Sequence, residues 1–140
     1  MKNLRTISAT AIFALVIFIM QGCSFSTANL SSLETYKDKD GKDKTSSFKG
    51  GDTIYAKAIV SNNPGNVKVK FSLADPQGKA LSGSEVSVDL SGDMNVASYS
   101  LPVTTALPAG SYKLSADMIN DEGEKKDSKS ETISIAEGSE

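Results

Sequence analysis

The chain has 140 residues, with 15 basic and 17 acidic side chains, a single cysteine, and neither histidine nor tryptophan. This length suits one domain with a core of modest size. One cysteine excludes an internal disulfide, and the lack of histidine excludes Ser-His and Cys-His nucleophile pairs and most zinc or transition-metal sites. The mildly acidic charge, without a basic stripe, argues against nucleic acid as a partner.

Residues 1–22 have the three parts of an export signal. Lys2 and Arg5 form a short cationic start, no acidic residue precedes Cys23, and the fourteen residues 7–20 are almost wholly apolar. As a helix this apolar run would reach about 21 Å, which is shorter than the roughly 30 Å core of a bilayer. A cationic start, a short apolar middle and small residues after it are typical of a secretory signal peptide.

Residues 19–24 (IMQGCS) resemble the lipobox of bacterial lipoproteins, in which an apolar residue lies three positions before a cysteine and a small residue lies directly before it. Gly22 and Cys23 match this pattern, whereas Met20 and Gln21 replace the more usual leucine and small residue. The resemblance implies cleavage before Cys23, a diacylglycerol on its thiol, and usually a further acyl chain, such as palmitate, on the new amine. Two or three chains anchor a protein stably, because one chain binds a bilayer only marginally.

Ser24 would be the second residue of the processed lipoprotein. In Gram-negative members of that family, serine rather than aspartate here goes with transfer to the outer membrane. The expected location is therefore the cell envelope, with the protein lipid-anchored in the outer membrane, and the domain is expected to face the periplasm. Two alternatives remain open. Residues 26–28 (STA) form a small-x-small site, where an ordinary signal peptidase would cut after Ala28 and release a soluble protein. Otherwise the apolar run would stay as an uncleaved anchor.

The segment between the cysteine and the domain is predicted to be a flexible tether over residues 23–33. It is rich in Ser, Thr, Ala and Asn and has no apolar periodicity. Residues 36–44 then alternate lysine and aspartate around Asp40 and Gly41. An Asp-Gly pair between extended segments favours a tight hairpin turn, because glycine tolerates a positive φ.

Residues 34–136 are predicted to form one all-β domain of seven or eight short strands. Apolar residues alternate with polar ones over residues 54–60, 67–73, 86–90, 97–101, 112–118 and 133–135. Turn-forming residues separate these segments at 62–65, 75–78, 91–93, 108–110 and 120–123. No segment after Cys23 has a helical apolar stripe, so we expect a β-sandwich whose two sheets bury their apolar faces together. Residues 137–140 are predicted to fray.

Three short motifs resemble bacterial immunoglobulin-like domains of the macroglobulin type. Residues 51–58 (GDTIYAKA), 75–79 (DPQGK) and 107–112 (LPAGSY) follow the family order of a GDTVY strand, a DP-x-GK turn and an LP-x-G-x-Y turn and strand. The resemblance covers about residues 48–135 and implies an immunoglobulin-like sandwich. The thioester of true macroglobulins needs a cysteine, which this chain lacks beyond Cys23. Tyr112 is placed to bury its ring and return its hydroxyl to the backbone, as in a tyrosine corner.

The acidic stretch Asp38-x-Asp40-Gly41-x-Asp43 resembles part of a calcium loop. An EF-hand loop that started at Asp38 would need glycine at its sixth position and glutamate at its twelfth, where the chain has Asp43 and Lys49. Interleaved lysines also repel a cation. A solvated hairpin is therefore the favoured interpretation, and calcium binding remains the alternative.

Two further groups of polar residues are candidate sites. Carboxylates of residues 121–124 lie in a Gly-containing turn among lysines, where nothing indicates the burial that acid–base chemistry needs. Lys57, Lys68, Lys70 and Tyr55 are predicted on the outer faces of neighbouring strands. They would either meet an anionic sugar or partner protein, or prevent edge-to-edge pairing of sheets; the second interpretation is favoured.

The sequence as a whole predicts a lipid-anchored, non-enzymatic binding or interaction module of the cell envelope. Its expected partners are the membrane, through lipidated Cys23, and an envelope protein or glycan; no catalytic, cofactor or metal residue is predicted. The alternative is a structural or accessory subunit of an envelope secretion or surface-assembly complex. The fold alone does not choose between them, because sandwiches host many unrelated roles.

Overall fold

The computed structural model describes residues 28–137, and this part of the chain contains eight β-strands and no helix. The predicted all-β fold of seven or eight strands is thereby confirmed. No segment among these residues forms an apolar helix of membrane-spanning length. The strands are β1 (Asn29–Tyr36), β2 (Ser47–Lys49), β3 (Thr53–Ser61), β4 (Asn66–Ala74), β5 (Val86–Ser91), β6 (Val96–Pro102), β7 (Gly110–Ile119) and β8 (Lys125–Ala136).

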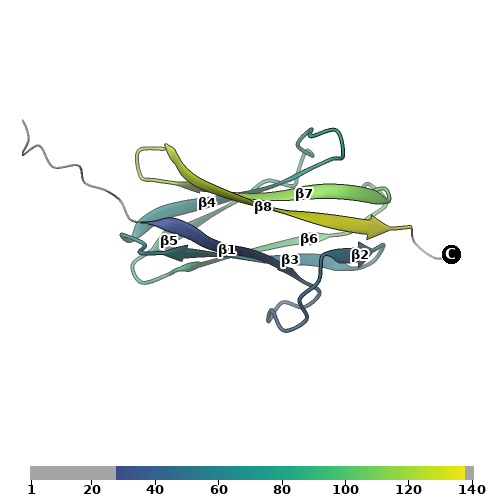
Figure 1. Cartoon of the computed structure of the whole chain (residues 1–140), viewed down its shortest axis with the longest axis horizontal. Helices are drawn as coiled ribbons and strands as arrows, with labels where there is room; N and C mark the ends of the chain where they lie inside the picture. The colour runs from purple at the N-terminus through teal and green to yellow at the C-terminus, as the bar shows by residue number, and fades with distance from the viewer. Residues whose placement is uncertain (1–27, 138–140) are drawn as a thin grey trace, which may run out of the picture.

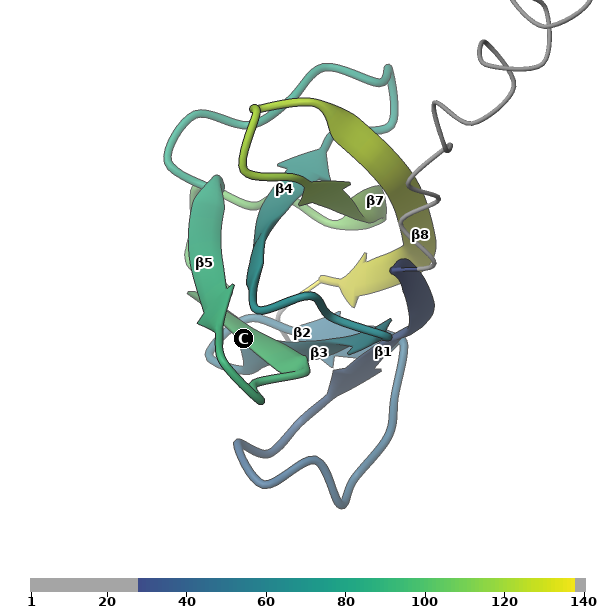
Figure 2. The same cartoon turned by 90° about the vertical axis from the view of Figure 1, so that its left-hand side faces the viewer.

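The strands form two facing sheets (Figures 1 and 2). A three-stranded sheet has the order β1-β3-β6, and a five-stranded sheet has the order β2-β8-β7-β4-β5. Neighbouring strands are antiparallel, except that the short β2 runs parallel to the end of β8. The two layers pack with their apolar faces inward, as expected for an aligned sandwich.

The period-two pattern of the sequence builds the core directly. The inward residues of β3 are at most 1% exposed, and those of β4 at most 4%. On β7, the expected inward set from Tyr112 to Met118 is buried as well. Each of these strands lies in the middle of its sheet, so one face is covered by the opposite sheet while the other meets solvent. The predicted core positions of these three strands are confirmed.

An aromatic contact joins the two sheets at the centre of the core. The rings of Phe71 on β4 and Tyr99 on β6 lie 5.2 Å apart between centroids, at an angle of 31°. The Tyr99 hydroxyl donates a hydrogen bond to the backbone carbonyl of Ser84, at 3.1 Å. The Ser84 hydroxyl accepts from the backbone N–H of Leu73 at 3.1 Å and donates to the carbonyl of Leu81 at 2.7 Å. The long β4–β5 connection is therefore tied to the core by hydrogen bonds.

The predicted tether is too long, because its second half is strand β1. Leu30 and Leu33 are 3% and 5% exposed and belong to the hydrophobic core. A shift of register between Leu30 and Ser32 interrupts the alternation of faces, which is why the sequence shows no period there. The backbone N–H of Leu30 also donates to the carboxylate of Asp127 on β8, at 2.9 Å. The domain therefore begins near residue 28 rather than 34.

Three other strands also differ from the expectations. β2 lies outside the predicted pattern, and β8 begins at Lys125, well before the expected apolar pair Ile133 and Ile135. The first half of β8 carries no apolar residue and is held by its backbone pairing with β7. On β5, Val86 was expected on the apolar face but is 38% exposed, because β5 is an edge strand.

Several predicted turns are confirmed. Residues 62–65 connect β3 to β4, with positive φ at Asn62 and Gly65. The Asn63 side chain accepts from the N–H of Gly65 at 3.0 Å and donates to the carbonyl of Met94 at 2.6 Å, which links this turn to the β5–β6 connection. Residues 75–79 form a turn closed by a hydrogen bond from the N–H of Asp75 to the carbonyl of Lys79.

Candidate functional site

The predicted lipidation residue, Cys23, lies outside the described residues, as do the whole predicted signal 1–22 and most of the predicted tail 137–140. The structure does establish where the chain enters the domain. β1 begins at Asn29, which pairs with Ser61 at the end of β3. The entry point is therefore at the end of the sandwich where β3 stops.

The connections between strands divide between the two ends of the sandwich. The entry end carries the turns 62–65, 92–95 and 120–124, beside the start of β1. The opposite end carries the connections 37–46, 50–52, 75–85 and 103–109. β8 also finishes at that opposite end, so the described chain enters at one end and leaves at the other (Figure 1).

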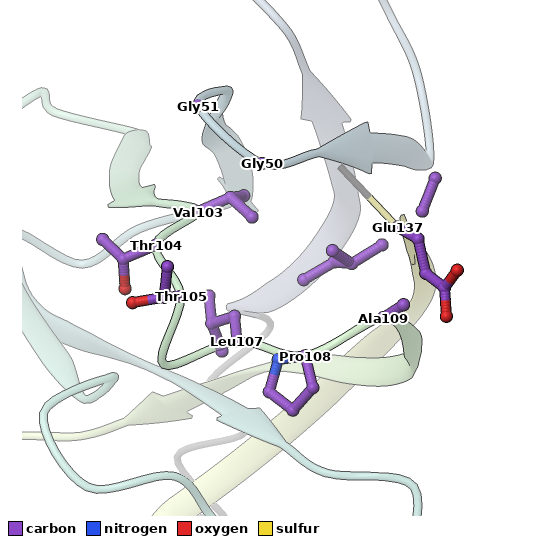
Figure 3. A pocket seen from close by; sticks show the side chains of 11 residues that line it. Gly50, Gly51, Val103, Thr104, Thr105, Leu107, Pro108, Ala109 and Glu137 are labelled. Carbon is purple, nitrogen blue, oxygen red and sulfur yellow. The ribbon is translucent and has the colours of Figure 1, made fainter. Parts of the chain in front are cut away.

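A cleft of about 760 Å³ lies at the end opposite the entry point. Figure 3 shows Gly50 and Gly51 on one side of it and Leu107, Pro108 and Ala109 on the other. The remaining lining residues are 103–105 and the end of β8 at 135–137. The β2–β3 and β6–β7 connections are joined beside the cleft, because the N–H of Gly51 donates to the carbonyl of Val103 at 3.1 Å.

The lining of this cleft is mainly apolar. Its walls are formed mainly by backbone and by apolar side chains, with Glu137 as the one carboxylate among the described lining residues. Neither a nucleophile–base pair nor a pair of carboxylates is present among those residues. Its size lies within the usual range for small-ligand sites. Sequence analysis singled out residues 107–112 as a motif, but it did not predict that they line a cleft.

The predicted tyrosine corner supports one wall of the cleft. Tyr112 is buried, and its hydroxyl donates a hydrogen bond to the backbone carbonyl of Pro108, at 2.6 Å. The bond links the first residues of β7 to the β6–β7 connection, which stiffens that connection. The role expected for Tyr112 is confirmed.

The acidic stretch 38–43 closes a loop on itself. The Asp38 carboxylate accepts hydrogen bonds from the backbone N–H groups of Asp43, at 2.7 Å, and Lys42, at 3.0 Å. These two amides hold the pKa of the Asp38 carboxyl below its ordinary value. Gly41 has a φ of +77°, as the expected Asp-Gly turn requires. Within residues 28–137, no three acidic side chains or thiols lie close enough together to hold a metal ion.

The predicted row of lysines is divided between the two sheets. Lys68 and Lys70 lie on β4, where they face Asp89 at 3.7 Å and Glu85 at 3.3 Å. Lys57 and Tyr55 lie on β3, in the other sheet. The expectation that all four share neighbouring strands is therefore wrong, because β3 and β4 are consecutive in sequence but cross from one sheet to the other.

A second hollow, of about 350 Å³, lies on the outer face of the three-stranded sheet. Tyr55 and Lys57 are paired across β3 and β6 with Ser100 and Ser98. The tip of the 37–46 connection, including Lys39 and Asp40, forms the wall, and we call this hollow the sheet-face groove. The sequence predicted Tyr55 and Lys57 on an outer face but did not single out the two serines. The alternation of these serines with Ala97 and Tyr99 was the pattern that could have placed them on the outer face.

The carboxylates of the β7–β8 turn form no acid–base pair. Asp121, Glu122 and Glu124 are all exposed, and the Asn120 side chain accepts hydrogen bonds from the backbone N–H groups of Glu122 and Glu124. The ammonium of Lys126, which hydrogen-bonds to Glu124, holds the pKa of that carboxyl below its ordinary value. A lowered pKa suits a permanent charge rather than a proton donor at neutral pH.

No protein-family model and no curated protein matches this sequence. Among solved structures, a β-glucuronidase from Bifidobacterium dentium, complexed with coumarin-3-O-glucuronide, aligns with a TM-score of 0.57 and 14% identity. The alignment covers 77% of this chain and 18% of that one. A family 76 glycoside hydrolase from a bovine Bacteroides thetaiotaomicron strain aligns at 0.49 and 23% identity, over 75% of this chain and 20% of that one. This chain therefore spans a fifth or less of either enzyme.

An immunoglobulin-like protein from Pseudomonas aeruginosa aligns along its full length with 81% of this chain, at a TM-score of 0.47 and 8% identity. The strand order by itself classifies the fold. In immunoglobulin-type sandwiches, strands A, B and E share one sheet, and C, F and G share the other, with C′ added in some types. Here β1, β3 and β6 form the first sheet, and β4, β5, β7 and β8 form the second, with the short β2 added beside β8. With the Tyr112 corner, this order makes the domain an immunoglobulin-like β-sandwich.

Proposed function

We propose that this chain is a lipoprotein of the bacterial cell envelope, anchored through Cys23, that displays a non-catalytic immunoglobulin-like binding module. The observation that carries the proposal is that the chain enters the sandwich at one end and the cleft lies at the other. The chain enters the domain at Asn29, while the cleft and the longest connections lie at the opposite end. An anchor before Asn29 would hold that opposite end away from the bilayer.

The short link between Cys23 and β1 limits how far the entry end of the domain can lie from the bilayer. Six residues at full extension reach about 20 Å. The nine residues of β3 span about 30 Å from one end of the sandwich to the other. The entry end would therefore lie close to the headgroups, and the cleft would lie roughly a domain length further out. The lipobox-like residues 19–24 support the same assignment, and Ser24 favours the outer membrane.

Burial of Ala28 supports cleavage at the cysteine over cleavage at the alternative site. Ala28 is 9% exposed and belongs to the hydrophobic cluster with Leu30. An enzyme that cut after Ala28 would remove this residue and leave a new charged amine on Asn29, directly at the edge of the core. Processing before Cys23 leaves that part of the core intact. The motifs 51–58, 75–79 and 107–112 further support the macroglobulin-type subclass as part of this proposal.

Replacing Cys23 with serine tests the anchor. We expect the wild-type chain to incorporate radiolabelled palmitate and to sediment with outer membranes. Cys23→Ser should incorporate none and should leave the outer-membrane fraction, because no acyl chain remains to partition into lipid. Ser24→Ala is the matched control, since it alters the neighbouring residue and leaves the thiol. A wild-type protein recovered in the soluble fraction with Asn29 as its first residue would contradict the proposal.

The position of the entry point predicts which end of the domain lies near lipid. A fluorophore attached to Glu122→Cys marks the entry end, and one attached to Thr105→Cys marks the cleft end; both positions are exposed. In the lipidated protein Cys23 is blocked, so each variant offers one free thiol. In liposomes with nitroxide-labelled headgroups, we expect stronger quenching at position 122 than at position 105. Equal or reversed quenching would contradict the proposed orientation.

A further inference from the structure

We propose that the sheet-face groove, formed by Lys39, Asp40, Tyr55, Lys57, Ser98 and Ser100, binds an anionic saccharide. This inference concerns the described domain alone and does not depend on the lipid anchor. The groove has about 350 Å³ of space, at the lower end of the range for small-ligand sites. Its floor is the outer face of β3 and β6, and its wall is the tip of the 37–46 connection.

The position of Lys57 gives the groove its charge. The Lys57 ammonium donates to the backbone carbonyl of Asp40 at 2.6 Å and lies 5.8 Å from the centre of the Tyr36 ring. Both partners are uncharged, and the carboxylate of Glu34, the cross-strand partner of Lys57 on β1, pairs instead with the ammonium of Lys44 at 2.7 Å. The Lys57 side chain is therefore held in place without an ion-pair partner. Gly41 makes room for this arrangement, because a Cβ there would come within 2.6 Å of the ammonium nitrogen.

The surrounding charges leave the groove cationic. Within residues 28–137, neither Lys39 nor Lys57 forms an ion pair, whereas the Asp40 carboxylate lies 3.7 Å from the ammonium of Lys42. Lys68 and Lys70 on the other sheet each face a carboxylate. In a chain with a net charge of −2, two uncompensated ammonium groups in one groove favour an anionic ligand.

The other lining groups favour a saccharide over a peptide. Tyr55 presents a partly exposed ring, and Ser98 and Ser100 present a row of hydroxyls. A sugar offers both apolar C–H faces for such a ring and hydroxyls for such a row. An extended peptide adds along a free strand edge, whereas this groove lies over the face of β3 and β6, and β3 is paired on both sides, with β1 and β6. The carboxylate of a uronic acid would then meet Lys57.

Titration with a uronic acid oligomer tests this proposal. The probe is trigalacturonate, with galactotriose as its neutral counterpart, and the sample is the full chain in detergent micelles, followed by backbone amide NMR. We expect saturable shifts at residues 57, 98 and 100 with trigalacturonate, and at least about tenfold weaker binding of galactotriose, since charge-assisted hydrogen bonds would be lost. Raising the salt concentration should weaken the binding of trigalacturonate.

Matched variants distinguish binding in the sheet-face groove from a nonspecific effect of positive charge. Lys57→Gln should weaken trigalacturonate binding by about tenfold, and Tyr55→Ala should weaken both saccharides. Lys68→Gln removes the same charge from the other sheet and should leave the affinity within about twofold. The amide spectrum of each variant shows that it is folded. Absence of saturable shifts, equal binding of both saccharides, or insensitivity to Lys57→Gln would each overturn the proposal, while the lipid-anchor proposal would stand.

Discussion

Phe71→Ala is expected to destabilise the domain by about 3–5 kcal/mol. Phe71 is completely buried on β4, and its ring contacts Tyr99 from the opposite sheet, 5.2 Å away between centroids. Truncation removes both the transfer free energy of the ring and the contact that joins the sheets, and it leaves a cavity that the surrounding strands fill only in part. A small domain has a total stability of about 5–15 kcal/mol, so this loss brings it close to unfolding.

Urea unfolding followed by circular dichroism measures this effect. Val86→Ala is the matched control, because Val86 is the cross-strand partner of Phe71 on β5 but is 38% exposed. We expect the control to cost less than about 1 kcal/mol, since little apolar area is removed from the core. Equal losses for the two variants would show that the sheet edge, rather than the contact between Phe71 and Tyr99, limits stability.

Alkaline pH is expected to destabilise the domain through Tyr99. Burial raises the pKa of the Tyr99 hydroxyl to about 12, because its phenolate would be desolvated between the sheets. The unfolded chain, with a tyrosine pKa of about 10, releases this proton earlier than the folded chain. The folded state therefore binds more protons between these values, and stability falls as the pH rises from about 10 to 12. The loss of stability from this one group is at most about 3 kcal/mol, and it begins near pH 10, where the unfolded chain starts to release the proton.

Unfolding free energies measured at pH 9 and pH 11.5 test this linkage. Tyr99→Phe has no proton to lose at this position, so we expect a smaller difference between the two pH values than in the wild type. The variant also lacks the hydrogen bond to Ser84, which lowers stability at both pH values and so cancels in the comparison. An unchanged pH dependence in Tyr99→Phe would contradict the assignment.

Tyr36 serves as an internal comparison, because a different cause governs it. Its hydroxyl donates to the Glu34 carboxylate at 2.6 Å, and this bond is the main reason that its pKa is raised to about 12, with burial second. Glu34→Gln should therefore lower the pKa of Tyr36 and leave that of Tyr99 in place. Phenolate absorbance, compared among wild type, Tyr99→Phe and Glu34→Gln, assigns the two titrations separately.

The sequence by itself determined the fold class and most of the core. On β3, β4 and β7, strict alternation assigns every buried residue correctly, because each of these strands has one face against the opposite sheet and one face in solvent. Turn residues such as Asn62 and Gly65 also have a local cause, since they supply the positive φ that the β3–β4 turn requires. The Tyr112 corner was predictable for a similar reason, because it depends on residues four positions apart.

Only the tertiary structure decided the ends of the domain and its surface sites. The strand character of residues 29–33 depends on pairing with β3, and that of residues 125–132 on pairing with β7, because their own side chains lack a clean apolar period. The cleft combines residues 50–51, 103–109 and 135–137, and the sheet-face groove combines residues 39–40, 55–57 and 98–100. The spacing of these segments along the sequence does not indicate that they lie close together in the fold. Lys57 has no ion-pair partner among the described residues, whereas Lys68 lies near Asp89, because β3 and β4 belong to different sheets and meet different neighbours.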